Sequence, residues 1–303
     1  MGMVEVDHIC VCVCTYKRPE LLEQLLAKLE RQRTGDSFSY SVVVVDNDIH
    51  ESARRTVESF AMNSVIPARY FVEKEQNIAL ARNRAVANAQ GEFIAFIDDD
   101  ESPIDDWLQL MRDAIIKYGV DGVLGPVKSV FEVAPPEWLE RAGLFDRPCD
   151  KTGAGIDWRK TGTGNVLVRQ QALRDIEGPF NPQLGSGGED VDFFRRATDA
   201  GRVFIWCEEA TAYEVVPVER TRLSFQVKRA LMRGRASFTS PAGNVGGIAK
   251  SFAAFAVYTT LLPLFLVMGR HMFIRYLISD LDHLGKLLAL CRINPIGKKY
   301  VVK

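Results

Sequence analysis

The first half of the chain alternates between short apolar runs and longer segments with helical spacing. Four runs rich in β-branched and apolar side chains predict buried strands at residues 8–15, 41–45, 69–72 and 93–97. Helical spacing of apolar residues predicts helices at residues 19–31 and 52–60. Strands that alternate with helices favour an α/β fold with a mostly parallel sheet and helices on both faces.

Polar residues follow three of the predicted strands. The first strand is followed by TYKR, the second by Asp46 and Asn47, and the strand at 93–97 by three consecutive aspartates, 98–100. The carboxyl ends of parallel strands form the crevice where open α/β sheets bind ligands. Three crowded carboxylates repel one another unless a cation or several donors compensate them, which suggests Mg²⁺ or Mn²⁺. A solvated acidic turn is the alternative.

Two further segments are candidates for chemistry. Glu189 and Asp190 follow a glycine-rich loop and begin a predicted helix that runs to Ala200, so they suit either a general base or a helix N-terminal cap. The segment TGTGN at 161–165 predicts a loop beside a substrate, or simply a glycine-rich turn into a strand at 166–169. Trp107 suits stacking on a sugar ring, but a core position is the better expectation.

Several classes of protein are disfavoured. No GxGxxG follows the first strand and no GxxxxGK[ST] occurs, which argues against dinucleotide and P-loop folds. A net charge of −1 lacks the excess of basic residues that is typical of nucleic-acid-binding proteins. The six cysteines have no zinc-site spacing, and no signal-peptide pattern precedes the first strand, so we expect a reducing, cytoplasmic compartment without disulfides.

The C-terminal segment differs from the rest. From residue 248 onwards there are eight Lys or Arg and two Asp, a charge of +6, which leaves −7 for residues 1–247. No charge lies between Lys250 and Arg270, and this apolar segment approaches the ~20 residues of a bilayer span. Pro263 would kink it, so an in-plane segment is an alternative. An amphipathic helix with basic residues follows, which favours a membrane surface on its cytoplasmic side.

These patterns predict an organisation in three parts. An α/β domain with the candidate site spans residues 1–238, with one half to about 128 and a second half from about 129. Residues 239–247 form a linker, and 248–303 form a helical tail that associates with the cytoplasmic face of the inner membrane. The other possibility for the tail is a helical hairpin packed on the α/β domain or at a dimer interface.

Six motifs occur in an order that resembles the family-2 glycosyltransferases, whose fold is called GT-A. They are CVCTYKRPELL, VVVVDN, QNIALARNRA, GEFIAFIDDDE, TGTGNVLVR and GGEDVDFFRRATDAG, which together extend over roughly residues 8–235. The resemblance implies an inverting enzyme, dependent on Mn²⁺ or Mg²⁺, that moves a sugar from a nucleoside diphosphate sugar, with UDP favoured. The implied acceptor is a hydroxyl of a glycan or a lipid-linked molecule, in bacterial exopolysaccharide or cell-envelope synthesis.

The resemblance also implies that the domain at 1–238 is catalytic, with the nucleotide-sugar half to about 128 and the acceptor half from about 129, and it implies roles for individual residues. The nucleotide sugar would contact Thr15, Tyr16, Arg18, Glu20, Asp46, Arg82, Asp98 and Asp99. The metal would be held by Asp100, Asp98 and Glu214. Asp190 would be the catalytic base, paired with Glu189 in an ED motif. A loop at the acceptor and donor sugar would contain Thr163, Gly164, Asn165 and Gly188.

Three alternatives stay open from the sequence. Glu214 could instead be a strand-end carboxylate paired with an arginine such as Arg220. The chain could be a sugar nucleotidyltransferase on a similar sheet, although it lacks the glycine-rich phosphate loop of that class. It could also be a non-catalytic binding or scaffold protein that keeps the fold.

Overall fold

The chain folds into two compact units. The computed structural model describes residues 7–147, 149–185, 187–239, 245–293 and 296. The first unit contains residues 1–128, 147–185 and 189–214, and the second contains 129–146, 186–188 and 215–303. This division differs from the predicted boundary at 238, because the helix that ends there packs with the C-terminal helices.

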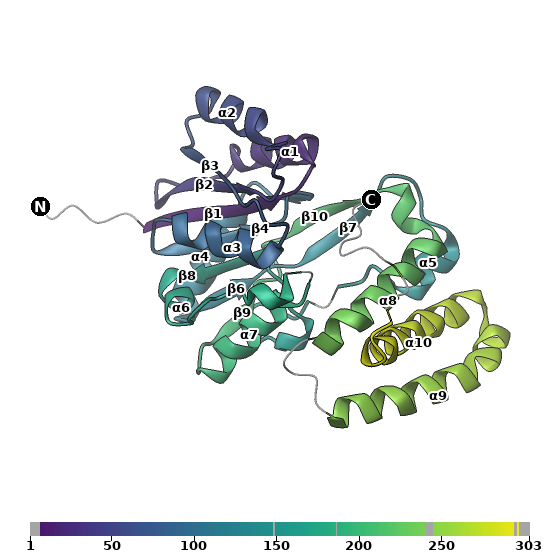
Figure 1. Cartoon of the computed structure of the whole chain (residues 1–303). Coiled ribbons are helices and arrows are strands. Elements are labelled where there is room, and N and C mark those ends of the chain that lie inside the picture. Colours follow the sequence, from purple (N-terminus) through teal and green to yellow (C-terminus); the bar gives the residue numbers. More distant parts are fainter. Residues whose placement is uncertain (1–6, 148, 186, 240–244, 294–295, 297–303) are drawn as a thin grey trace, which may run out of the picture. The chain divides into compact units, whose positions relative to one another are not determined.

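The first unit is built on a seven-stranded, mostly parallel sheet (Figure 1), as predicted. In spatial order its strands are β3 (Ala68–Val72), β2 (Phe38–Asp46), β1 (Asp7–Thr15), β4 (Phe93–Ile97), β8 (Asn165–Arg169), β6 (Gly122–Leu124) and β9 (Phe204–Trp206). Strand β8 is antiparallel to both of its neighbours, β4 and β6. The other pairs in this sheet are parallel.

Helices cover both faces of this sheet, and the alternation of side chains along β1 decides which core each residue joins. Ile9, Val11 and Val13 pack in a core with α1 (Pro19–Leu29), α2 (Arg54–Asn63) and α4 (Trp107–Tyr118). Cys10 and Cys12 face the opposite core, with α3 (Ile78–Asn88), α6 (Gln170–Arg174) and α7 (Glu189–Asp199). The cysteines of β1 are therefore small core residues, as predicted, and all six cysteines are free.

Element boundaries differ slightly from those predicted. The helix expected at 52–60 begins at Arg54, because the Asp46 carboxylate accepts hydrogen bonds from the backbone N–H groups of Asp48 and Ala53 and holds the intervening residues as a turn. Three short 3₁₀ helices were not predicted: η1 (Trp158–Lys160), η2 (Pro182–Leu184) and η3 (Val218–Thr221).

A small second sheet extends the strand-end region. Its order is β5 (Glu101–Pro103), β10 (Ala212–Val216) and β7 (Val127–Phe131). Strands β5 and β10 are antiparallel, and their register sets Glu101 directly opposite Glu214. Two carboxylates in this relation repel each other unless a cation lies between them.

The second unit is mainly helical. Its helices are α5 (Glu137–Ala142), α8 (Leu223–Thr239), α9 (Val245–Met268) and α10 (Arg270–Leu290). Helix α10 packs against α5, α8 and α9. A Cβ atom on Gly234 of α8 would lie 1.9 Å from the Asp282 carbonyl oxygen, and one on Gly285 of α10 would lie 2.3 Å from that of Leu231. The two backbones therefore touch where α8 and α10 cross.

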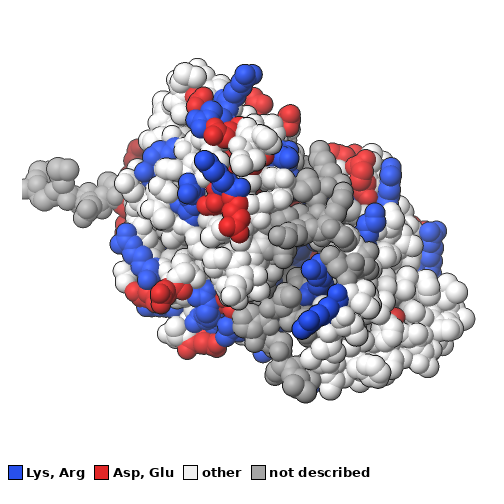
Figure 2. All heavy atoms as spheres, in the orientation of Figure 1, with Lys and Arg blue, Asp and Glu red and all other residues white. Residues whose placement is uncertain are grey.

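Helix α9 is apolar and largely exposed. Its residues Gly247–Met268 have a mean hydropathy of 1.9, are long enough to cross a bilayer, and are only 6% buried, the one such helix in the described part of the chain. Figure 2 shows an extensive uncharged surface at the lower right, where Figure 1 labels α9. The helix continues through Pro263. Of the predicted linker at 239–247, Thr239 and residues 245–247 lie in helices, and 240–244 lie outside the described residues.

Candidate active site

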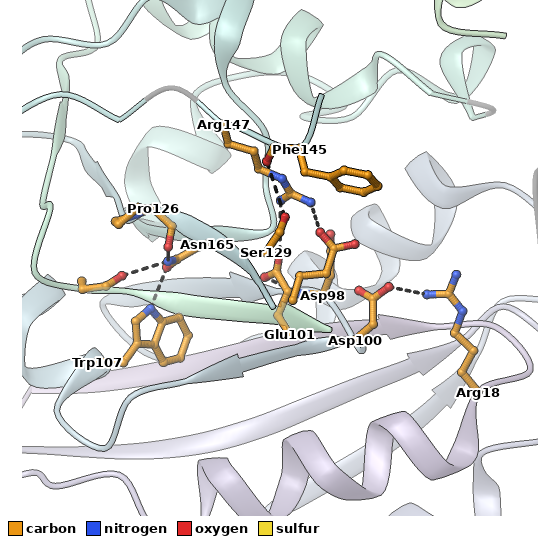
Figure 3. Close-up of polar contacts among 12 residues, drawn as sticks. Arg18, Asp98, Asp100, Glu101, Trp107, Pro126, Ser129, Phe145, Arg147 and Asn165 are labelled. Atoms are coloured by element: carbon orange, nitrogen blue, oxygen red, sulfur yellow. Dashed lines mark hydrogen bonds and ion pairs between the residues drawn. The ribbon is translucent and has the colours of Figure 1, made fainter. Parts of the chain in front are cut away.

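The predicted convergence of strand ends is confirmed for β1 and β4. The Thr15 hydroxyl, at the end of β1, donates a 2.7 Å hydrogen bond to Asp99, which follows β4. One Arg18 nitrogen, Nη1, lies 3.1 Å from Asp99 Oδ1 and 3.0 Å from Asp100 Oδ2. Figure 3 shows Arg18 reaching toward Asp100. The sequence prediction that donors must compensate the aspartate run is thus met on one side by Arg18.

Arg82 compensates the other side of the run. Its side chain, on α3, is 10% exposed and bridges two carboxylates from different elements. Nη1 pairs with Oε1 of Glu189 at the start of α7, and Nη2 lies 3.5 Å from Asp98 Oδ1. One guanidinium therefore connects the segment after β4 to the ED pair.

Asp190 of the ED pair lies beside the loop at 161–165. An Asp190 oxygen lies 3.3 Å from where a Cβ atom of Gly162 would stand, so a side chain at Gly162 would crowd that carboxylate. Asp190 also accepts a 2.7 Å hydrogen bond from the N–H of Val191 in the first turn of α7. Asp190 therefore contacts the first turn of its helix and is directed toward the loop, and its roles as a general base or a helix cap stay predictions.

A hollow of about 270 Å³ lies between these elements. Asp98, Asp190 and the loop 161–165 form part of its wall, together with three cationic side chains, Arg82, Arg147 and Lys160. The Thr163 hydroxyl on this wall is buried and has no hydrogen-bond partner among the residues that the structure describes. Small-ligand pockets usually hold about 300–1,000 Å³, so this hollow suits a part of a nucleotide sugar rather than all of it.

Arg147 was not predicted, and it resolves the repulsion between the facing carboxylates of β5 and β10. Nη1 of Arg147 lies 3.6 Å from Glu101 Oε1, and Nη2 pairs with Glu214. Figure 3 shows Arg147 directed toward this acidic group. Glu214, predicted as a metal ligand or an arginine partner, has an arginine partner here. The acidic run DDDE hints at Glu101, but nothing near Arg147 in sequence marks it.

Burial changes the proton affinity of several of these carboxyls. Burial raises the pKa of Asp99 to about 7, although Arg18 acts against the shift. Burial likewise raises the pKa of Glu189 to about 7, opposed by Arg82. Burial, and then the charge of Asp98, raise the pKa of Glu101 well above its usual range. The site thus holds acidic groups that exchange protons near neutral pH, which is common where catalysis occurs.

The structure gives Asp46 a different role from the predicted one. Asp46 is 0% exposed, and besides the two backbone N–H groups its carboxylate accepts a 2.9 Å hydrogen bond from the Tyr70 hydroxyl. Its oxygens fix the loop after β2, and because the residue is fully buried, this conformation does not present them to uracil or ribose. Tyr16 is half-buried with the Lys17 ammonium 5.2 Å above its ring, and Glu20 is exposed in the first turn of α1.

Asn165 and Trp107 form a structural pair. Trp107 is fully buried, and its Nε1 donates a 2.7 Å hydrogen bond to Asn165 Oδ1. Asn165 Nδ2 donates to the carbonyls of Pro126 and Ala210 (Figure 3). The core expectation for Trp107 is confirmed, and the Asn165 side chain supports the loop from behind instead of facing a sugar.

Gly164 and Gly188 of the predicted loop are favoured as glycine for two different reasons. A Cβ atom on Gly164 would lie 2.6 Å from Glu101 Oε1 and 3.1 Å from Asp98 Oδ2, so only glycine lets the loop approach these carboxylates. Gly188 has φ +95° immediately before α7, a backbone conformation that side chains disfavour.

The residues present can hold a divalent cation in one specific mode. Among the described residues, no three His, Cys, Asp or Glu side chains gather as a metal site, so the predicted set of Asp98, Asp100 and Glu214 is not assembled. Mg²⁺ is often bound by one or two carboxylates together with substrate phosphates. The Asp98 side chain is 46% exposed and lines the hollow, so Asp98 fits that mode, whereas the Asp100 side chain is 13% exposed and pairs with Arg18.

Comparisons with known proteins identify the family of this chain. The family described as "Glycosyl transferase family 2" matches residues 10–176. The succinoglycan biosynthesis protein ExoM of Rhizobium meliloti is 36% identical over 232 residues, 76% of this chain and 74% of ExoM. Glycosyltransferase AglE of Haloferax volcanii is 30% identical over 198 residues, 65% of this chain and 63% of AglE.

Solved structures show the same fold. TarS of S. aureus, in a crystal structure of residues 1–349 with UDP-GlcNAc, aligns with a TM-score of 0.56 at 15% identity, covering 95% of this chain and 93% of that one. The complex of the same TarS fragment with UDP gives a TM-score of 0.55 at 16% identity. With the family match and the ExoM similarity, the carboxylates at the strand ends have an explanation: this chain is a GT-A-fold member of glycosyltransferase family 2.

Proposed function

We propose that this glycosyltransferase is a metal-dependent, inverting enzyme that moves a sugar from a UDP-sugar to a hydroxyl of a glycan or lipid-linked acceptor. The observation that carries the proposal is that Asp98 and Asp190 line one hollow and are linked through Arg82 and Glu189. Similarity to a succinoglycan biosynthesis protein supports a role in polysaccharide or envelope glycoconjugate synthesis. TarS structures with UDP and UDP-GlcNAc support UDP as the nucleotide.

In this mechanism Asp190 is the general base. The acceptor oxygen forms a bond to the anomeric carbon of the donor while the bond from that carbon to the diphosphate breaks, and the acceptor proton passes to the Asp190 carboxylate. The nucleoside diphosphate leaves with the bonding electrons. A single displacement of this kind inverts the configuration at the anomeric carbon. Asp190 suits the role because its helix N-terminus holds it still beside the loop 161–165.

The leaving diphosphate needs positive charge. A bound Mn²⁺ or Mg²⁺, held by Asp98 and Asp100, would supply part of it as a Lewis acid. Arg147 and Lys160 line the hollow and offer further donors to phosphate oxygens. Arg82 orients Glu189 and Asp98, and the unpartnered Thr163 hydroxyl is available to a sugar hydroxyl.

Donor hydrolysis without an acceptor tests the proposal. The purified protein is incubated with Mn²⁺ and a panel of UDP-, GDP- and dTDP-sugars, and release of nucleoside diphosphate is measured. We expect slow release from one UDP-sugar, because water can replace the acceptor. Release of pyrophosphate instead would indicate a nucleotidyltransferase, and no release together with no UDP binding would indicate a scaffold protein.

The metal is tested separately by calorimetry. Asp100→Ala is expected to abolish Mn²⁺-dependent UDP binding, whereas Glu23→Ala, which removes an exposed carboxylate from α1, leaves it unchanged. Unchanged affinity in Asp100→Ala would contradict the assignment of that residue to the metal.

A further inference from the structure

Helix α9 of the second unit exposes large apolar side chains to water. On α9, Leu264 is 55% exposed, Leu266 56% and Val267 86%, and no Asp, Glu, Lys or Arg lies between Lys250 and Arg270. Exposed apolar patches of this kind mark sites that bind protein or membrane. The question is which of the two covers α9, and in what orientation.

The contacts of α9 argue against a helix that crosses a bilayer. It pairs antiparallel with α10 after a turn at Gly269, and the contacts run along the pair: the Thr259 hydroxyl donates a 3.0 Å hydrogen bond to Asp280, and Phe265 stacks on Tyr276 at 3.7 Å. Helix α10 carries Arg275, Asp282 and Lys286 beside this apolar helix. Carrying these charges into a bilayer core with α9 is costly.

The other contacts of α10 join it to α8 and α5. Arg233 of α8 binds the Asp282 carboxylate through two nitrogens, at 3.0 and 2.5 Å. The backbones of α8 and α10 touch at Gly234 and Gly285. At the other end of the pair, the Arg270 guanidinium lies 5.9 Å from the Trp138 ring of α5. Helix α10, the partner of α9, is therefore fixed to α8 and α5 along its length.

A cationic hollow of about 430 Å³ lies at the turn between α9 and α10. Trp138, Arg141, Arg270 and His271 line it, and Met268 at the end of the apolar helix closes one side. Glu137 also lines it, but this carboxylate pairs with Arg141 at 3.1 Å. Arg270 has no ion pair within the described part of the chain. An aromatic ring with basic groups beside exposed leucines is the arrangement of a membrane-interface contact.

We propose that α9 lies in the plane of an anionic membrane surface with its outer face among the acyl chains, and that the hollow at Arg270 receives the phosphate of a lipid headgroup. The charge pattern supports lipid over a second copy of the chain, since basic residues flank the apolar stretch at both ends. This inference deepens the proposed use of a lipid-linked acceptor, because in-plane docking places the enzyme where such an acceptor lies.

Vesicle co-sedimentation of the full chain tests the site. The protein is mixed with sealed phosphatidylcholine vesicles with or without phosphatidylglycerol, in the absence of nucleotide sugar. We expect binding only to the anionic vesicles, weakened about fivefold by Arg270→Gln, the effect of one basic side chain at an anionic surface. Arg275→Gln, on the same helix but outside the hollow, is the matched control and should weaken binding less. Equal losses would overturn the headgroup site.

Orientation is tested in the same vesicles. Bound protein should be released by alkaline carbonate, and an Arg275→Cys variant that lacks Cys149 and Cys291 should react with an impermeant maleimide added outside. Resistance to carbonate, or labelling only after detergent, would show a spanning helix and overturn the in-plane orientation. A lipid-free dimer dissociated by Leu264→Gln would assign the face to a second copy instead. Because no donor is present, a failure of the proposed transferase activity would not alter these results.

Discussion

The two units depart in opposite ways from the usual arrangement of apolar side chains inside and charged side chains outside. In the first, charged groups are inside: Arg82 is 10% exposed, and Glu189, its partner, has a side chain only 3% exposed. In the second, apolar groups are outside, along α9. Buried charges are costly unless paired, and exposed apolar patches favour association. The comparison teaches that buried charges and exposed apolar side chains each need a partner. The first unit supplies arginines for its buried carboxylates, whereas the second leaves its apolar helix uncovered.

The largest expected effect comes from removing the proposed base in the first unit. Asp190→Asn should lower the rate of sugar transfer about 10²–10⁴-fold, the usual contribution of a general base. UDP binding should persist, because Asp190 is not assigned to the nucleotide. Transfer kinetics and calorimetry measure the two. Asp199→Asn, at the exposed end of the same helix, is the control. A normal rate in Asp190→Asn would remove the assignment.

Breaking the buried ion pair should cost stability. Arg82→Met leaves Glu189 buried without its cation, and removing one partner of such a pair costs about 3–5 kcal/mol. Urea unfolding measures the loss. Arg54→Met removes an exposed arginine with two carboxylate partners and should cost much less, because exposed ion pairs contribute little to stability. The double variant with Glu189→Gln should recover part of the loss; no recovery would show that Arg82 stabilises the fold by packing alone.

A smaller loss is expected from the support behind the loop. Trp107→Phe keeps the ring in the core but leaves Asn165 Oδ1 without its donor, at a cost of about 1–3 kcal/mol. Trp158→Phe, at a partly buried position, serves as the comparison in the same unfolding assay. If the two variants lose equal stability, the lost hydrogen bond to Asn165 does not explain the destabilisation of Trp107→Phe.

The raised pKa of Asp99 predicts a dependence of stability on pH. Its pKa in the folded state, about 7, lies above the usual value near ~3.9, so the folded protein binds the proton more tightly than the unfolded chain does. This contribution to stability is complete below about pH 4 and is lost as the pH rises through 7. Melting temperatures at pH 5 and pH 8 should therefore differ less in Asp99→Asn than in the natural protein. An unchanged difference would place the titration elsewhere.

The smallest effect on stability should come from the second unit. Leu264→Gln changes a residue that is 55% exposed, so the free energy of unfolding in solution should move by no more than ~0.5 kcal/mol. The same variant should bind anionic vesicles more weakly. A large loss of stability without lipid would mean that α9 is covered within the protein. It would contradict the difference drawn here between the two units.

Much of the first unit could be predicted from sequence, because its apolar residues repeat with the periods of strands and helices. The strand at 93–97 and the aspartates after it needed no tertiary information. Partners distant in sequence could not be foreseen: Arg147 lies 67 residues from Glu214. Asp46 and Asn165 were predicted to contact ligand because the family resemblance implied it. Only the structure shows that their hydrogen bonds go to the protein.

The glycine crossing of α8 and α10 affects how this chain can be recombined with others. Gly234 and Gly285 meet with no room for a methyl group, so each helix is shaped to one partner. A gene fusion that joins another tail after α8 would bring a helix that lacks the matching glycine. The C-terminal helices should therefore be inherited together with α8, and natural exchange between such enzymes should occur before Leu223 rather than at the junction between α8 and α9.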